Sequence, residues 1–338
     1  MTTPFDAEMV YAWVDPLSES QVAELLVAAD YALSNGDEHF AVAALDRAYG
    51  ARPGESTIAK QRASVLDRLA FEEHGLRFRY IPGGTFLMGS NSGDPDERPI
   101  HPRRVEPFFM ADTPVSYEDY CRLRGWEPPP LGMPKSPAQT GVVAVTDIKI
   151  RRHYCRRIIG ARDAGQLTTS WDLPMVAVTW SDVVGLLLCL SPEFDVPTEA
   201  EWEKAARGGL VGRAYPWGDE PPQKELCDFD RFGDFTMRLP RTLPPNGYGL
   251  YGMAGGVSEW TRDRYDALAY QHHHRLGPSP AAPPSTEPIV RVTRGGSWAD
   301  CAAAVTVSFR ATQSNPGPST PNIGVRLVKR LAARTPYD

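Results

Sequence analysis

The sequence lacks an excess of positive charge and any long apolar run. It has 36 Lys and Arg against 42 Asp and Glu, for a net charge of −6. Nucleic-acid-binding proteins carry a basic patch, so no nucleic-acid partner is expected. The longest apolar run, Val183–Leu190, is about half of the roughly 20 residues that span a bilayer. We therefore expect no membrane contact. The N-terminus has neither the charge nor the apolar core of a signal peptide, which predicts a cytoplasmic location.

The cysteines of the chain also lack the spacing that is typical of disulfide-rich or zinc-binding proteins. Its five cysteines are odd in number and contain no C-x-x-C spacing, which argues against a disulfide framework or a zinc knuckle. Reduced thiols are expected. By contrast, the 32 prolines and 29 glycines are more than an average protein of this length carries. This composition predicts long irregular loops.

The N-terminal part, residues 1–75, is predicted to be a small helical module. Ser18 and Gln21 have the spacing of a capping box, and apolar residues recur at intervals of three and four. Breaks at 35–37 and at Pro53-Gly54 indicate two antiparallel helices, followed by a third over Thr57–Glu73. The pattern resembles one tetratricopeptide unit. A single unit cannot bury its own apolar face, so it should pack on its own domain or on a second copy. If the helices do not pack on their own domain, they predict a homodimer or a protein partner bound through them.

From residue 76 to residue 338 the pattern changes to that of a loop-rich α+β domain. Phe78–Ile81 and Thr85–Gly89, separated by Pro82-Gly83-Gly84, predict a strand, a turn and a strand. We predict one more strand over Val105–Met110. The remaining patterns predict a helix from Ser116 to Leu123, loop over 127–139, a buried helix over Ser181–Leu190, and a two-turn helix that Thr198 and Glu201 cap and Gly208-Gly209 ends.

A series of short strings in this second domain resembles the formylglycine-generating-enzyme, or sulfatase-modifying-factor, family. In order they are IPGGTFLMGS (81–90), PVS (114–116), PMVAVTW (174–180), VPTEAEWEKAARGG (196–209), YPWG (215–218), PNGYGLYGM (245–253), SEWT (258–261), RGGSW (294–298) and IGVRL (323–327). The resemblance implies an elaborated C-type-lectin-like fold, preceded here by the helical module. Fold does not determine function, because this family includes oxidases, sulfoxide synthases and non-catalytic binding proteins.

The segment after the last glycine pair departs from the enzymes of this family. By resemblance, two cysteines five positions apart should follow Trp298 and bind Cu(I) as thiolates. In one register these positions hold Asp300 and Val305, and in the other Cys301 and Thr306. Neither register supplies the pair, so formylglycine generation is not expected.

The resemblance still predicts a polar cleft around this segment. The candidate catalytic residues are Ser297, Trp298, Asp300 and Cys301, and the candidate substrate-binding residues are Arg310, Gln313 and Asn315. Arg310 has the guanidinium geometry that holds a carboxylate in two hydrogen bonds. Two alternatives stay open: Arg310 as a buried salt-bridge partner, and Cys301 as a buried inert thiol.

Two groups of residues are candidate metal ligands. Family members commonly hold structural calcium in loops, and the residues that could do so here are Asp228, Asp230, Asp234 and Glu259. Gly256 replaces the family's asparagine ligand, so Glu259 could instead accept hydrogen bonds from loop amides. His272 or His274 could join Asp300 and Cys301 around iron, copper or cobalt. A solvated histidine loop is the alternative.

The function that this sequence predicts is a metal-dependent, O2-using oxidoreductase that acts on a small polar metabolite in a biosynthetic pathway. A helical cap ahead of this domain resembles the architecture of the family member found in toxoflavin-type clusters. The alternative is a non-catalytic lectin-like binding or scaffolding protein. The run Ala302–Val307 offers few polar groups, which counts against the binding form of this alternative.

Overall fold

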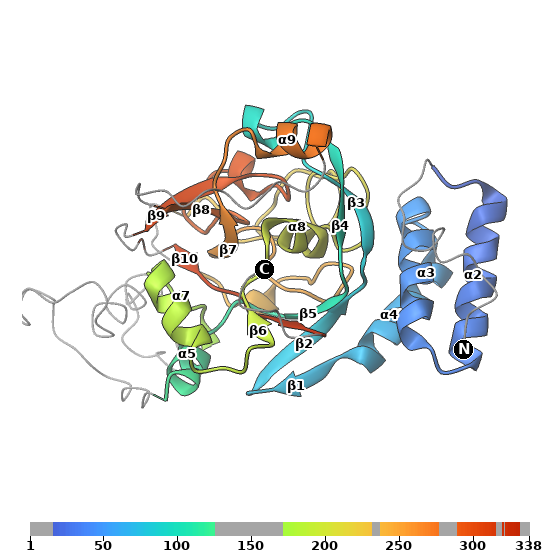
Figure 1. Cartoon of the computed structure of the whole chain (residues 1–338), viewed down its shortest axis with the longest axis horizontal. Coiled ribbons are helices and arrows are strands. Elements are labelled where there is room, and N and C mark those ends of the chain that lie inside the picture. The colour runs from blue at the N-terminus through green and yellow to red at the C-terminus, as the bar shows by residue number, and fades with distance from the viewer. Residues whose placement is uncertain are drawn as a thin grey trace, which may run out of the picture.

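The computed structural model describes residues 16–125, 172–231, 237–276, 289–315, 320 and 322–331. Figure 1 shows a module of helices beside a larger body of short strands, helices and loops. None of the helices in the described ranges combines the length and apolar character needed to cross a membrane.

The module consists of three helices, α2 (Glu19–Ser34), α3 (Glu38–Ala51) and α4 (Ser56–Leu69). The capping box of Ser18 and Gln21 is present, and the predicted helix hairpin is confirmed. The expected extension of the third helix to Glu73 is wrong. The chain becomes extended at Ala70 and forms strand β1 (Phe71–Glu73). Phe71 leaves the helix because its ring packs on Phe78 and Phe109, with centroids 5.4 and 4.8 Å apart.

The module packs on its own domain, one of the two alternatives left open by the sequence. Its apolar faces share a core cluster with Trp202 and Tyr248 of the larger body. Arg62 of α4, 2% exposed, donates to the carbonyls of Gly208 and Gly247 at 2.9 and 3.0 Å. A contact with a second copy or a protein partner stays a prediction.

Three sheets organise the larger body. A five-stranded antiparallel sheet has the order β1-β2-β5-β11-β6. A four-stranded sheet has the order β10-β7-β8-β9, in which β10 runs parallel to β7. A hairpin pairs β3 with β4. The bounds are β2 (Leu76–Ile81), β3 (Gly84–Met88), β4 (His101–Val105), β5 (Phe108–Ala111), β6 (Phe194–Asp195), β7 (Ser258–Arg264), β8 (Ile289–Arg294), β9 (Ala311–Asn315), β10 (Ile323–Gly324) and β11 (Val328–Arg330).

One strand prediction is confirmed and another is wrong. The strands on either side of Pro82 both form, but they belong to different sheets, since β2 pairs with β5 and β3 pairs with β4. The single strand expected over Val105–Met110 is two strands. Pro107 separates them because it has no N–H to donate to a ladder.

Short helices fill the spaces around the sheets: α5 (Tyr117–Leu123), α7 (Trp180–Leu187), α8 (Glu199–Arg207) and α9 (Ala269–Leu276), with 3-10 turns η1 (Pro95–Glu97), η4 (Pro240–Thr242) and η5 (Ala302–Val305). The α8 prediction is confirmed at both ends, with the Thr198 capping box and Gly208 at φ +59°. The helix expected over Ser181–Leu190 exists, but it is not buried all round. Val184 and Leu188 are 41% and 81% exposed. The predicted loop at 127–139 lies outside the described residues.

Candidate functional site

Helix α8 lies in the middle of the larger domain (Figure 1). Its carboxylates pair with arginines that are buried in this domain. Glu203 is fully buried between Arg207, 2.6 Å away, and Arg294. These arginine charges hold the pKa of Glu203 below its ordinary value although burial opposes them. Glu201 pairs in the same way with Arg330. Helix α8, whose two ends are capped, therefore holds the irregular loops together through the ion pairs of its carboxylates.

Arg310, a candidate for substrate binding, belongs to this network. Its Nε donates to Glu199 Oε1 at 2.7 Å and its Nη2 to Glu199 Oε2 at 3.2 Å. Its guanidinium also lies 4.6 Å from the ring centroid of Tyr270. Burial disfavours its charge, but Glu199 raises its pKa above the ordinary arginine value. The structure thus places Arg310 in a buried salt bridge, which is the alternative weighed from the sequence.

Glu259, a candidate calcium ligand, has both carboxylate oxygens occupied. Arg326 contacts it with three N···O distances of 2.7, 3.0 and 3.0 Å, and Trp202 Nε1 donates to Oε2 at 2.7 Å. Both partners of the ion pair are 0% exposed. Glu259 thus serves as the counter-ion of Arg326, and a calcium ion would have to displace an arginine.

The other calcium candidates do not converge in the described part of the chain. Asp228 is buried, pairs with Arg231 Nε at 2.8 Å and accepts a hydrogen bond from the Arg238 amide at 2.7 Å. Burial raises its pKa above the ordinary value. Asp230 is exposed, and Asp234 lies outside the described residues.

Two of the four candidate catalytic residues, Ser297 and Asp300, form a polar cluster with Asn322 just after β8. Ser297 Oγ donates to Asp300 Oδ2 at 2.6 Å, and the Asn322 amide nitrogen donates to Ser297 Oγ at 3.1 Å. Cys301 is exposed, so its alternative as a buried thiol is wrong. Trp298 is 1% exposed and packs in the apolar core beside this cluster. Sequence reasoning did not single out Asn322, although it directly precedes the family string at 323–327.

The remaining candidates are two histidines and two residues of β9, and only the side chain of His272 belongs to the described residues. His272 sits on α9, where a solvated loop was the alternative, and its Nδ1 is 3.6 Å from Asp266 Oδ2. His274 belongs to the same helix, but its side chain lies outside the described residues. Gln313 and Asn315 belong to β9, and their side chains are likewise not described.

The described donors do not fit the copper site that the family resemblance implies. Val305, in one register, is fully buried, and Thr306, in the other, offers a hydroxyl. Soft thiolate pairs are what bind Cu(I), and residues 298–309 contain a single cysteine, Cys301. Nowhere in the described ranges do three or more His, Cys, Asp or Glu side chains converge as metal ligands would.

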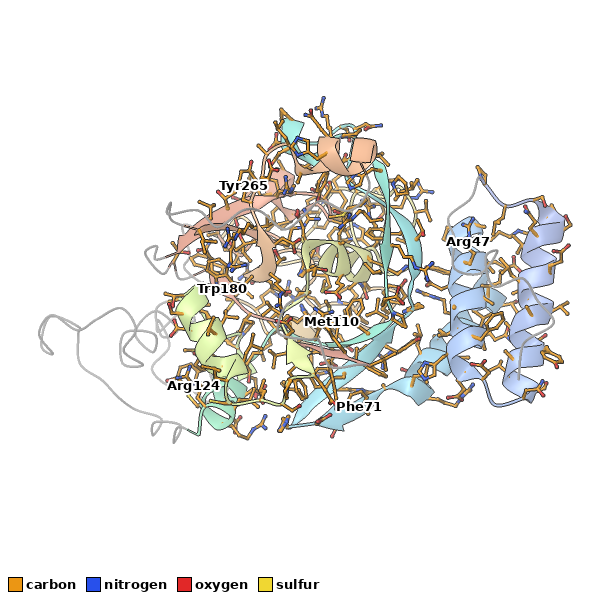
Figure 2. All side chains as sticks on the ribbon, in the orientation of Figure 1. Arg47, Phe71, Met110, Arg124, Trp180 and Tyr265 are labelled. Atoms are coloured by element: carbon orange, nitrogen blue, oxygen red, sulfur yellow. The ribbon has the colours of Figure 1, made fainter. Side chains whose placement is uncertain are left out.

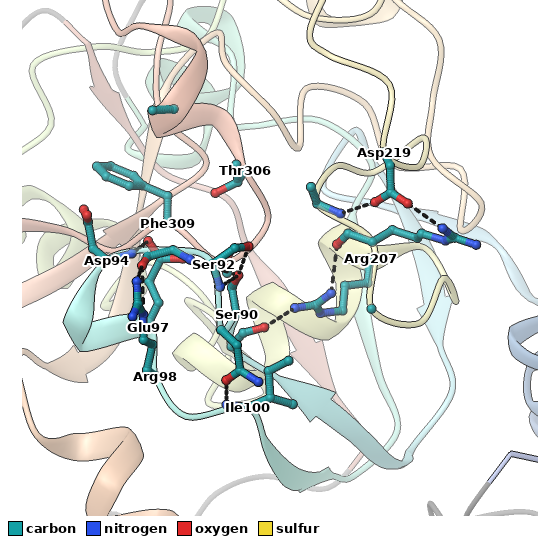
Figure 3. A pocket seen from close by; sticks show the side chains of 18 residues that line it. Ser90, Ser92, Asp94, Glu97, Arg98, Ile100, Arg207, Asp219, Thr306 and Phe309 are labelled. Atoms are coloured by element: carbon teal, nitrogen blue, oxygen red, sulfur yellow. Dashed lines mark hydrogen bonds and ion pairs between the residues drawn. The ribbon is translucent and has the colours of Figure 1, made fainter.

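A cavity of about 820 Å³ lies beside the η5 segment, whose Ala303 lines it (Figure 3). Four segments line it: loop 89–100, the end of α8, residues 212–219 and residues 303–309. Ligand pockets commonly measure ~300–1,000 Å³, so its size suits a small molecule. Asp300 and Cys301 line neither this cavity nor the two smaller ones beside the helical module.

The walls of this cavity are strongly polar. Arg207 and Arg213 are engaged, the first by Glu203 and the second by Asp219. Glu97 is different. It is 2% exposed, its Oε1 accepts from the Asp94 amide at 3.1 Å, and its Oε2 has no hydrogen-bond partner among the described residues. Gly93 leaves room for this carboxylate, since a Cβ there would lie 2.1 Å from Oε2.

The Glu97 turn was not foreseen as a site. Its only sequence signal is the run Asp94-Pro95-Asp96-Glu97, which has the spacing of a helix cap. Nothing in that spacing indicates that the loop faces residues 303–309, more than 200 positions later.

Comparison with known proteins identifies the domain. Residues 73–331 match the sulfatase-modifying factor enzyme 1-like domain. The chain is 32% identical to the formylglycine-generating enzyme of Streptomyces coelicolor over 283 residues, covering 73% of this chain and 87% of that enzyme. It is also 32% identical to the protein named serine/threonine-protein kinase pkn1 of Chlamydia pneumoniae over 251 residues, 74% of this chain. The matched region spans only 37% of that relative's length.

The fold agrees with these matches. PvdO from Pseudomonas aeruginosa superposes with a TM-score of 0.55 at 20% identity, covering 78% of this chain and 98% of that one. A likeness at this identity concerns the fold alone. Together, the family match over most of the chain and the identity to a full-length enzyme lead to one conclusion: the chain belongs to the family of sulfatase-modifying factor enzyme 1-like domains.

Proposed function

We propose that this chain is a binding member of its family, which holds a small polar molecule bearing an amino group in the 820 Å³ cavity. The observation that carries the proposal is Glu97, a buried carboxylate in the cavity wall with an oxygen that accepts no hydrogen bond from the described residues. Leaving such an oxygen unpaired costs about 1–3 kcal/mol or more. An ammonium group would offset this cost, because it combines charge with three donors.

The rest of the lining supports the same ligand class. Figure 3 places Asp94 and Glu97 on one side of the cavity and Asp219 on the other. Ser90 and Ser92 add hydroxyls, and Phe309 adds an apolar surface for the body of the ligand. No Cys or His side chain lies among the lining residues, so nothing in this wall supplies redox chemistry or a soft metal ligand.

Titration calorimetry with L-lysine and spermidine, and with hexanoate as a probe without an amine, tests this proposal. We expect the amines to bind and hexanoate not to bind. Glu97→Gln should weaken amine binding at least tenfold, because it removes the charge and keeps the shape. Glu106→Gln is the matched control, since that side chain is 80% exposed and lies outside the lining. Equal binding by wild type and Glu97→Gln, or no amine binding, would overturn the proposal.

A second candidate function is a metal-dependent oxidoreductase that uses O2 on a small polar metabolite. The observation in its favour is the exposed thiol of Cys301 next to Asp300, whose carboxylate Ser297 orients. Metal analysis of protein purified without added metal distinguishes the two functions. Stoichiometric iron, copper or cobalt that is lost in Cys301→Ala and in Asp300→Ala supports the oxidoreductase. Calcium alone, or metal retained in both variants, counts against it.

A further inference from the structure

A small cavity of about 50 Å³ lies at the junction between the helical module and the larger domain. Its walls come from three elements that are distant in sequence: Asp46 and Arg47 of α3, Phe86 of β3, and Lys204 of α8. Figure 2 shows Arg47 on α3, where the module faces the domain. A ligand in this cavity would touch both parts of the protein.

Lys204 is the unusual group in this cavity. It is 7% exposed, and within the described part of the chain its ammonium takes part in no hydrogen bond or ion pair. Its Nζ lies 5.6 Å from the centroid of the Phe86 ring. A buried ammonium without a hydrogen-bonded partner is costly. Its position in a cavity wall indicates that the partner is a molecule from solution.

The neighbouring carboxylates are already matched by other groups. Asp46 Oδ1 lies 2.6 Å from Arg62 Nη2, and its Oδ2 accepts a hydrogen bond from the Tyr248 hydroxyl at 2.9 Å. Arg47 adds a second positive charge to the cavity wall. Burial lowers the pKa of both Arg47 and Lys204. Lys204 and Arg47 therefore share a single carboxylate in this cavity wall, Asp46, which is already paired with Arg62.

The size of the cavity selects the partner. A water molecule needs at least ~10–15 Å³ of such space, so the cavity holds a few waters or one small ion. A lysine ammonium is a compact point charge that suits small anions. We propose that this cavity binds one small inorganic anion, chloride or phosphate, between Lys204 and Arg47, and that the anion stabilises the docking of the helical module.

Chemical unfolding at constant ionic strength tests the proposal, with gluconate replaced by chloride in one series and by inorganic phosphate in another. For one saturable site, a tenfold rise in the free concentration of the anion above its Kd raises the folding equilibrium constant about tenfold. We expect this slope in wild type for chloride or for phosphate, and the series that shows it identifies the anion. Lys204→Met should lose the slope. It should also be at least as stable as wild type in gluconate, because an apolar side chain replaces a buried charge.

Lys60→Met is the matched control, since Lys60 is exposed on α4 of the same module, and it should keep the wild-type slope. A flat wild-type response to both anions would overturn the proposal. So would an equal slope in wild type and Lys204→Met, because a general salt effect acts on both. If Lys204→Met does not fold, Arg47→Met replaces it, because Arg47 lines the same cavity, and an equal slope in wild type and Arg47→Met would overturn the proposal in the same way. The amine-binding experiment does not involve this cavity, so the two proposals fail separately.

Discussion

Glu259→Gln should destabilise the protein strongly because it removes the charge of the carboxylate that Arg326 contacts directly in the described core. Both side chains are 0% exposed and share three contacts of 3.0 Å or less. Breaking a buried pair by removing one partner costs about 3–5 kcal/mol, because the remaining charge stays buried without compensation. The folding equilibrium constant should therefore fall roughly 10²- to 10⁴-fold.

Urea unfolding of the full chain, followed by tryptophan fluorescence and far-UV circular dichroism, measures this loss. Arg326→Met should cost a similar amount, and the double variant should cost clearly less than the sum of the two single changes. Glu106→Gln provides the surface control, with an expected change of less than about 0.5 kcal/mol.

The same experiment separates an arginine counter-ion from a calcium ligand. Adding EGTA should leave the stability of both wild type and Glu259→Gln unchanged if the arginine is the partner. The reasoning is refuted if Glu259→Gln costs under about 1 kcal/mol. It is also refuted if EGTA destabilises wild type but not the variant.

Three further predictions follow from buried and capping groups. Burial and the neighbouring Glu199 raise the pKa of Asp263 from 3.8 to about 6, so its ionisation weakens the folded state as the pH rises from about 4 to about 6. Asp263→Asn should thus be about 3 kcal/mol more stable than wild type at pH 7 and equal to it below pH 4, and a gap independent of pH in urea unfolding would contradict this. Cys301→Ala should remove one thiol that reacts rapidly with DTNB in the native protein, because Cys301 is exposed. Cys227→Ala should remove none, since burial raises the pKa of Cys227 to about 12. If both variants lose the same number of reactive thiols, Cys301 is not accessible. Thr198→Ala should lower the free energy of unfolding by about 1 kcal/mol and Thr198→Ser by much less, because serine still caps α8, and calorimetry that finds equal losses would exclude capping as the cause.

Much of the local structure could be predicted because its determinants lie within a few residues of one another. The capping boxes at Ser18 and Thr198 join groups three positions apart, and Gly208 ends α8 in a conformation that glycine readily adopts. Predictions failed where a distant contact decided the outcome. Phe71 leaves the third helix for two aromatic partners in other strands, one of them Phe109.

The candidate site could be predicted only in part. The sequence identified the segment around Ser297, but it could not tell which polar residues in this domain face one another. Asn322 joins Ser297 from 25 positions away. Glu97 lines the same cavity as residues 303–309 only because strands β3 and β4 carry its loop there.

By itself the sequence determined the family, the capped ends of α2 and α8 and the loss of the paired copper thiolates, since each is written in short strings of neighbouring residues. Only the tertiary structure decided what the charged residues do. Arg310 meets Glu199 across 111 positions, and Arg326 meets Glu259 across 67. A guanidinium can serve a ligand or a carboxylate equally well by its chemistry, so its role depends on which partner the folded chain brings within hydrogen-bond distance.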